Sequence, residues 1–145
     1  MIFALLLACT ELEYDSTAEC PEDTGYAPAE QPDDQLLPDR PPVIVSTVPQ
    51  AGDLAVNPGL TEIRATFSKD MSHNGWSYVI TWADHFPEVV GDPVWEDPRT
   101  VVLTVSLAAD TGYSLGFNNQ SYENFRDTSG NVAVPYELSF HTAPQ

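Results

Sequence analysis

The sequence predicts an all-β fold, an antiparallel β-sandwich of about seven strands with Greek-key connections. Three observations support this prediction. Short runs rich in β-branched and aromatic residues fill the chain from residue 42 onward, and turn-forming residues separate these runs. No stretch keeps a helical period over three turns. Short strands at this spacing are typical of two sheets packed face to face.

The predicted strands alternate between apolar and polar positions. In 61–67, Ile63, Ala65 and Phe67 share one face, as in a strand with one buried side. The run 100–107 repeats this pattern. The other predicted strands are 43–48, 76–82, 113–117 and 136–140, with shorter runs near 88–90 and 94–95. Turn signals such as Ala51-Gly52-Asp53 and Ser129-Gly130-Asn131 lie between the strands.

Several aromatic side chains are predicted to have structural roles rather than to bind a ligand. The run 76–82 places Trp76, Tyr78, Ile80 and Trp82 on one face, which predicts that Trp82 lies in the core. Phe67 and Met71 are also predicted core residues. Tyr113 follows a glycine turn and precedes a strand. This position predicts a tyrosine corner, in which the hydroxyl group bonds back to the backbone.

Negative charge is concentrated before the β-rich part. The chain holds 5 Lys and Arg against 22 Asp and Glu, a net charge of -17. Residues 10–40 contain ten acids and one base, and they are rich in proline. Such a segment buries too little apolar area to offset its backbone entropy. We therefore predict a disordered acidic tether over 10–40 and a folded domain over 41–145.

The first nine residues form an apolar run that is too short for a transmembrane helix. Leu6-Leu7-Ala8-Cys9 resembles a bacterial lipobox, which implies a signal over 1–9 and lipidation of Cys9. No Lys or Arg precedes the run, unlike the usual signal. Plain secretion and a cytosolic chain with an apolar start are the alternatives. If Cys9 carries lipid, Cys20 has no partner within the chain, so a free thiol and an interchain disulfide both stay open. A Cys9–Cys20 disulfide requires that Cys9 stays free.

Four motifs resemble those of bacterial Ig-like domains of the S-layer-protein (SbsA) type. They are the Pro-Pro opening and strand at 41–52, the Phe-Ser-x-x-Met signature at 67–71, the Leu-turn-Tyr at 107–113, and the Asp-x-x-Gly-Asn turn at 127–131 with the closing Phe-x-Thr strand. The resemblance covers Pro41 to Thr142. It implies an extracellular Ig-like sandwich used as a spacer, adhesion or accessory module, with no catalytic residues to transfer.

The candidate ligand-binding residues are Trp76, Trp95, Tyr122 and Arg126. Flat aromatic side chains on a sandwich can stack on sugar rings, and the long polar loop 118–131 lies where sandwiches build binding sites. Each has a structural alternative. The two tryptophans can belong to the core, and Arg126 can pair with Asp127 or Glu123. Calcium at Asp127 and Asn131 is the minor alternative, because the loop lacks the full EF-hand series.

The expected function is a non-catalytic, envelope-anchored Ig-like module for display or adhesion, with a carbohydrate-binding module as the alternative. The charge excludes nucleic acid, since phosphate contact needs clustered cations. We expect no cofactor and no metal, because His73, His85 and His141 share no ligand spacing. The expected partners are a membrane, through the lipid anchor, and a surface protein or glycan. Thr10 after Cys9 favours the outer membrane by resemblance to the usual sorting rule.

Overall fold

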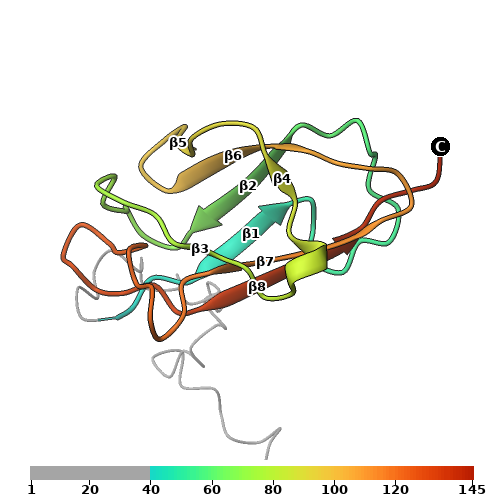
Figure 1. Cartoon of the computed structure of the whole chain (residues 1–145). Helices are drawn as coiled ribbons and strands as arrows, with labels where there is room; N and C mark the ends of the chain where they lie inside the picture. Colours follow the sequence, from blue (N-terminus) through green and yellow to red (C-terminus); the bar gives the residue numbers. More distant parts are fainter. Residues whose placement is uncertain (1–39) are drawn as a thin grey trace, which may run out of the picture. The chain divides into compact units, whose positions relative to one another are not determined.

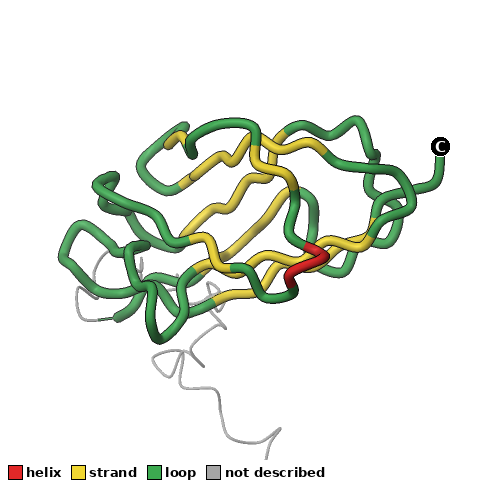
Figure 2. Tube along the Cα trace, in the orientation of Figure 1, coloured by secondary structure: helices red, strands yellow, loops and turns green. Residues whose placement is uncertain are grey.

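The computed structural model describes residues 40–145, and structural statements below refer to this part of the chain. Cys9, Cys20 and residues 10–39 of the predicted tether lie outside it. Strands and loops make up nearly all of the fold, with one short 3₁₀ turn, η2 (Ala83–His85) (Figure 2). The strands are β1 (Ile44–Val48), β2 (Glu62–Phe67), β3 (Tyr78–Val79), β4 (Glu88–Val89), β5 (Val94–Trp95), β6 (Thr100–Ser106), β7 (Gly112–Phe117) and β8 (Tyr136–His141).

The strands form two antiparallel sheets (Figure 1). One has the order β1-β2-β6-β4, with β5 also paired to β6, and the other has the order β3-β7-β8. The chain changes sheet after β2, after β3 and after β6, so strands distant in sequence become neighbours. The predicted antiparallel β-sandwich is confirmed. The strands number eight rather than about seven, because β3, β4 and β5 are separate pieces of two residues each.

The core lies between the two sheets and follows the predicted alternation. Ile63, Ala65 and Phe67 of β2 are buried, whereas the residues between them are partly exposed. The same alternation holds for Val101, Leu103 and Val105 of β6. Burying a large apolar side chain contributes about 1.5–3 kcal/mol to the free energy of unfolding. The buried residues between the two sheets are therefore the main stabilising feature of the domain.

Two further core predictions are confirmed. Met71 is buried with Phe67. The Tyr113 hydroxyl accepts a hydrogen bond from the Ala108 backbone N–H at 2.7 Å, which is the predicted tyrosine corner. This bond fixes the turn that enters β7.

The prediction for the run 76–82 is wrong at its end. The strand stops at Val79, and Trp82 is 64% exposed rather than buried. The reason lies on β7. Gly116 has no side chain on the outer face of the sheet, and a Cβ there would lie 3.2 Å from Thr81 Cγ2. Thr81 also shares a hydrogen bond with the Ser114 hydroxyl. The chain therefore leaves the sheet edge and crosses its outer face.

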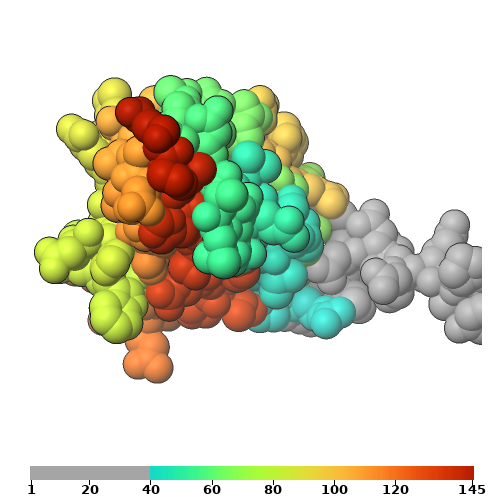
Figure 3. Space-filling view, turned by 90° about the vertical axis from the view of Figure 1, so that its right-hand side faces the viewer, coloured from blue at the N-terminus to red at the C-terminus, as the bar shows by residue number. Residues whose placement is uncertain are grey.

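The C-terminal strand is covered at its free edge. The backbone of Gly52 bonds to Ser139, and that of Val56 bonds to His141. In Figure 3 the red C-terminal residues accordingly lie against the green residues that follow β1. The uncovered edge of this sheet is therefore β3, on the side opposite β8. No helix in residues 40–145 is long and apolar enough to cross a bilayer.

Candidate binding groove

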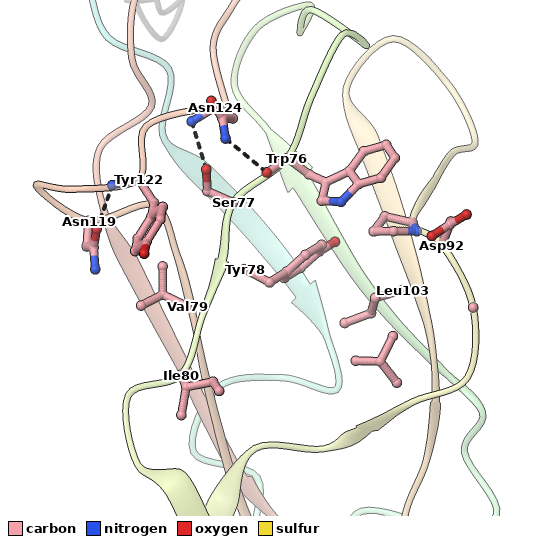
Figure 4. Close-up of a pocket in the computed structure, with 13 residues that line it drawn as sticks. Trp76, Ser77, Tyr78, Val79, Ile80, Asp92, Leu103, Asn119, Tyr122 and Asn124 are labelled. Carbon is pink, nitrogen blue, oxygen red and sulfur yellow. Dashed lines mark hydrogen bonds between the residues drawn. The ribbon is translucent and has the colours of Figure 1, made fainter.

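A cavity of about 690 Å³ opens beside the uncovered edge of β3, and we call it the β3 groove (Figure 4). It lies between the two sheets' edge strands, with Leu103 of β6 at its base. Its main lining residues are Trp76, Tyr78, Ile80, Asp92, Asn119 and Tyr122. They come from β3 and its flanks, from the loop between β4 and β5, and from the loop after β7.

The loop after β7 is held firmly against β3. The buried Asn118 side chain donates to the carbonyls of Phe125 and Ala133 and accepts the Phe125 N–H. Asn118 has a φ of 59°, a left-handed conformation that asparagine tolerates better than most residues. Asn124 N–H donates to the Ser77 hydroxyl at 2.8 Å. These contacts give the groove wall a fixed shape.

Two of the four sequence-predicted ligand residues meet in this groove. Trp76 is 40% exposed and Tyr122 is 61% exposed, and both line it. In Figure 4 the two rings lie on either side of the segment 76–80, with the Trp76 indole near Asp92. A ligand that contacts both rings therefore crosses the edge strand.

Polar groups lie between the aromatic rings. The Asn124 amide donates to the Trp76 carbonyl at 3.3 Å, which leaves its oxygen available. Asn119 uses its oxygen to accept from Ser121 and Tyr122, which leaves its NH₂ group available. The groove thus offers both donors and acceptors beside flat apolar surfaces. The sequence placed Asn119 and Asn124 in a polar loop, but it gave no signal that they face β3.

Tyr78 forms part of the inner wall. Its hydroxyl is buried and has no hydrogen-bond partner among the described residues. Burial raises the pKa of Tyr78 well above its ordinary value, so the phenol stays neutral. Its ring packs edge-on against Phe125, with 5.3 Å between ring centroids.

Trp95 and Arg126, the other two predicted residues, do not line the groove. Trp95 is half-buried and stacks on His73 with 4.6 Å between ring centroids. Arg126 pairs with Glu123 at 3.4 Å and also donates to the Gly130 carbonyl. The alternatives considered from the sequence, core packing and pairing with Glu123, describe these contacts.

Asp127, the residue considered for calcium, serves a buried structural turn. Its carboxylate accepts the N–H groups of Ser129 and Asn131 and the Asn131 amide, and it lies 3.5 Å from the Lys69 ammonium. Burial alone would raise the pKa of Asp127, but the hydrogen bonds and the Lys69 charge outweigh it, so this pKa lies below its ordinary value. Lys69 also donates to the Arg40 carbonyl.

Glu96 and Asp97, in the turn between β5 and β6, make separate contacts and do not form a carboxylate pair. Glu96 pairs with Arg64, whereas Asp97 accepts the N–H groups of Arg99 and Thr100. Paired carboxylates that hydrolyse glycosides must face one substrate from two sides. These contacts instead give Glu96 and Asp97 structural roles in the turn between β5 and β6.

Comparison with known proteins identifies the family to which the chain belongs. A family profile described as a bacterial Ig-like domain matches residues 38–142. A search of curated proteins finds no match.

Solved structures with a similar fold include CopC from Methylosinus trichosporium OB3b, with a TM-score of 0.54 and 16% identity over 72% of this chain and 95% of that one. PcoC, a copper resistance protein from Escherichia coli, has a TM-score of 0.50 and 16% identity over 68% of this chain and 97% of that one. The S-layer protein rSbsC has a TM-score of 0.44 and 18% identity over 72% of this chain and 14% of that one. At 16% identity the likeness to CopC and PcoC shows the fold alone.

Proposed function

Because the chain belongs to the bacterial Ig-like domain family, we propose that it is a non-catalytic module of the cell envelope, used for display or adhesion at the surface. The β3 groove is its contact surface. The finer resemblance to the SbsA type remains part of this proposal.

The observation that supports this proposal most strongly is the exposure of Trp76 and Tyr122 in one groove. An isolated exposed aromatic residue is ordinary, but two in one hollow with open amide groups form a surface suited to binding. Aromatic residues are enriched among the residues that dominate binding energy. The fixed loop wall adds to this, since a preformed surface loses little entropy when it binds.

A sedimentation assay tests the proposal. The full chain is mixed with isolated cell envelopes of the source bacterium, and the bound fraction is measured after pelleting. We expect Trp76→Ala and Tyr122→Ala to lower the affinity by about tenfold or more, as is usual for central aromatic contacts. Trp82→Ala is the matched control, because Trp82 is an exposed tryptophan that does not line the β3 groove. Equal binding by all three variants and the unaltered chain would contradict the proposal.

A lipid anchor at Cys9 is the second part of the proposal. The lipobox-like Leu6-Leu7-Ala8-Cys9 and the acidic stretch after it support it. The anchor would hold the module in the outer membrane, with 10–40 as its tether. Mass spectrometry of the mature N-terminus tests this part. We expect an acylated Cys9, whereas an unmodified Met1 in the cytosolic fraction would overturn the anchor.

Carbohydrate binding is the second candidate function, and the chemistry of the groove favours it. Sugar rings present C–H faces that pack on aromatic rings, and hydroxyl groups that pair with amides and carboxylates. Trp76, Tyr122, Asn119, Asn124 and Asp92 provide both kinds of contact. Enzymatic removal of either protein or polysaccharide from the envelopes distinguishes the candidates. Loss of sedimentation after polysaccharide removal alone supports the glycan, and loss after protease treatment alone supports a protein partner.

A further inference from the structure

Two histidines that lie 56 positions apart in the sequence line one cavity on the outer face of the β7–β8 sheet. This cavity has a volume of about 470 Å³ and is separate from the β3 groove. His141 ends β8 and pairs with Gly112 of β7, whereas His85 ends η2. In Figure 3 the yellow-green residues around η2 project beside the orange and red strands. The crossing of the chain over Gly116 is what carries His85 to this face.

The hydrogen bonds fix both imidazole rings in the same tautomer. His85 Nδ1 lies 2.9 Å from the Gly112 carbonyl oxygen, and His141 Nδ1 lies 2.8 Å from the Thr142 carbonyl oxygen. A carbonyl oxygen can only accept, so each Nδ1 must carry the hydrogen. Each neutral ring then has its lone pair on Nε2, and neither Nε2 has a hydrogen-bond partner within residues 40–145.

Ring atoms of both histidines lie close to the same point, the place where a Cβ on Gly112 would be. That Cβ would lie 3.5 Å from His85 Nδ1, 3.9 Å from His85 Cε1 and 3.6 Å from His141 Cδ2. Nε2 is the next ring atom after Cε1 in His85 and after Cδ2 in His141. Because position 112 is glycine, no side chain separates the rings.

Such a pair has the features of a metal site. Histidine ligands usually donate their second ring nitrogen to a carbonyl or carboxylate, which orients the ring and leaves the other nitrogen for the metal. Imidazole nitrogen suits zinc, copper and nickel ions. No three His, Cys, Asp or Glu side chains form such a group in the part of the chain that the structure describes, so the pair supplies two ligands and water fills the other positions.

We propose that His85 and His141 together form a binding site for a divalent metal ion that imidazole ligands suit, such as Zn²⁺ or Cu²⁺. This site is independent of the β3 groove and of the proposed envelope function. Trp82 lies beside it, with 6.4 Å between its ring centroid and that of His85.

Proton NMR of the full chain, produced without a histidine tag, tests the proposal with Zn²⁺ as the probe. The chain has 3 histidines, so it gives three Hε1 signals. We expect the signals of His85 and His141 to shift together during a Zn²⁺ titration. His73 is the internal control, because its ring stacks on Trp95 elsewhere in the domain, and its signal should stay in place. No shift of either signal, or an equal shift of all three, would overturn the proposal.

Single variants show whether the two rings act as a pair. His85→Gln should abolish the Zn²⁺-induced shift of His141, and His141→Gln should abolish that of His85. His73→Gln should leave both shifts intact. A His141 signal that still moves over the same Zn²⁺ range in His85→Gln would contradict a shared site. The amide spectrum of each variant reports whether it folds.

The unaltered chain provides a second test that needs no variant. Nitrogen-15 shifts of the imidazole rings at neutral pH should show Nδ1 protonated in both His85 and His141. An Nε2-protonated tautomer in either ring would remove the lone pair that the site requires and would overturn the proposal.

Discussion

The ring of Phe125 packs against those of Phe67, Tyr78, Trp95 and Phe117. It is fully buried, and its ring lies 5.4 Å from Phe67 and 5.7 Å from Phe117, between centroids. It also joins the core to the loop that carries Tyr122. A single residue therefore links stability to the shape of the β3 groove.

Phe125→Ala should lower the free energy of unfolding by about 3–5 kcal/mol, because it leaves a cavity among rings that cannot close it. Urea unfolding followed by tryptophan fluorescence measures this loss. Tyr122→Ala is the control in the same loop, since its side chain is 61% exposed and its removal should change stability little. A similar loss in both variants would contradict the central position of Phe125.

The Lys69–Asp127 pair predicts an acid-dependent contribution to stability. Both side chains are almost fully buried, at 4% and 3% exposure. The folded-state pKa of Asp127 lies below its ordinary value. Its contribution is therefore complete above the unfolded-state pKa of about 4 and is lost as the pH falls through the folded-state pKa.

Asp127→Asn should destabilise the domain by about 3 kcal/mol at neutral pH, because it removes the negative charge that lies 3.5 Å from the buried Lys69 ammonium. Urea midpoints measured from pH 7 down to pH 3 check this. We expect the difference in urea midpoint between the unaltered chain and the variant to become smaller below about pH 4. Asp92→Asn, at an exposed acid, should give a small gap at every pH. A pH-independent gap for Asp127→Asn would contradict the assignment.

The groove residues show which parts of a binding site can be predicted from a sequence pattern. Residue type and loop position predict Trp76 and Tyr122 as ligand candidates, and the structure brings them into one groove. Trp95 has the same chemistry, but the β5–β6 hairpin turns it toward Phe67. Which tryptophan faces solvent depends on strand pairing, and strand pairing is a long-range property that local alternation does not contain.

Among the strands, β2, β6 and β8 were predictable because each is long and half-buried, so burial imposes a period of two. β3, β4 and β5 have two residues each, which is too short for a period. The run 76–82 misled for this reason: its alternation continues past the point where pairing with β7 ends.

Gly116 controls where the chain leaves β3. Gly116→Val should lower stability and raise the hydrogen exchange of residues 79–82, because its Cβ would lie 3.2 Å from both Thr81 Cγ2 and Val79 Cβ. Hydrogen-exchange mass spectrometry resolves this segment. Gly91→Val is the matched control, since a Cβ at position 91 would have no neighbour within 4 Å. Unchanged exchange over 79–82 in Gly116→Val would show that the crossing does not depend on this contact.

For the whole chain, the distribution of charge distinguishes residues 10–40 from residues 41–145. Residues 10–40 carry about half of the total of -17, and the rest spreads over residues 41–145. We predict that a chain of residues 40–145 unfolds at the same urea midpoint as the full chain, because an acidic, proline-rich segment buries little apolar area. A lower midpoint for the shorter chain would show that the predicted tether packs on the domain.

The central claim is that the β3 groove is the binding surface of an envelope module, and the indole N–H signals test it directly. The chain has 3 tryptophans, one in the groove, one half-buried and one on the face beside His85. NMR spectra of the full chain are recorded with increasing amounts of solubilised envelope polymer. We predict that the Trp76 indole signal shifts while those of Trp82 and Trp95 stay in place. A spectrum in which Trp82 shifts and Trp76 does not would contradict the claim.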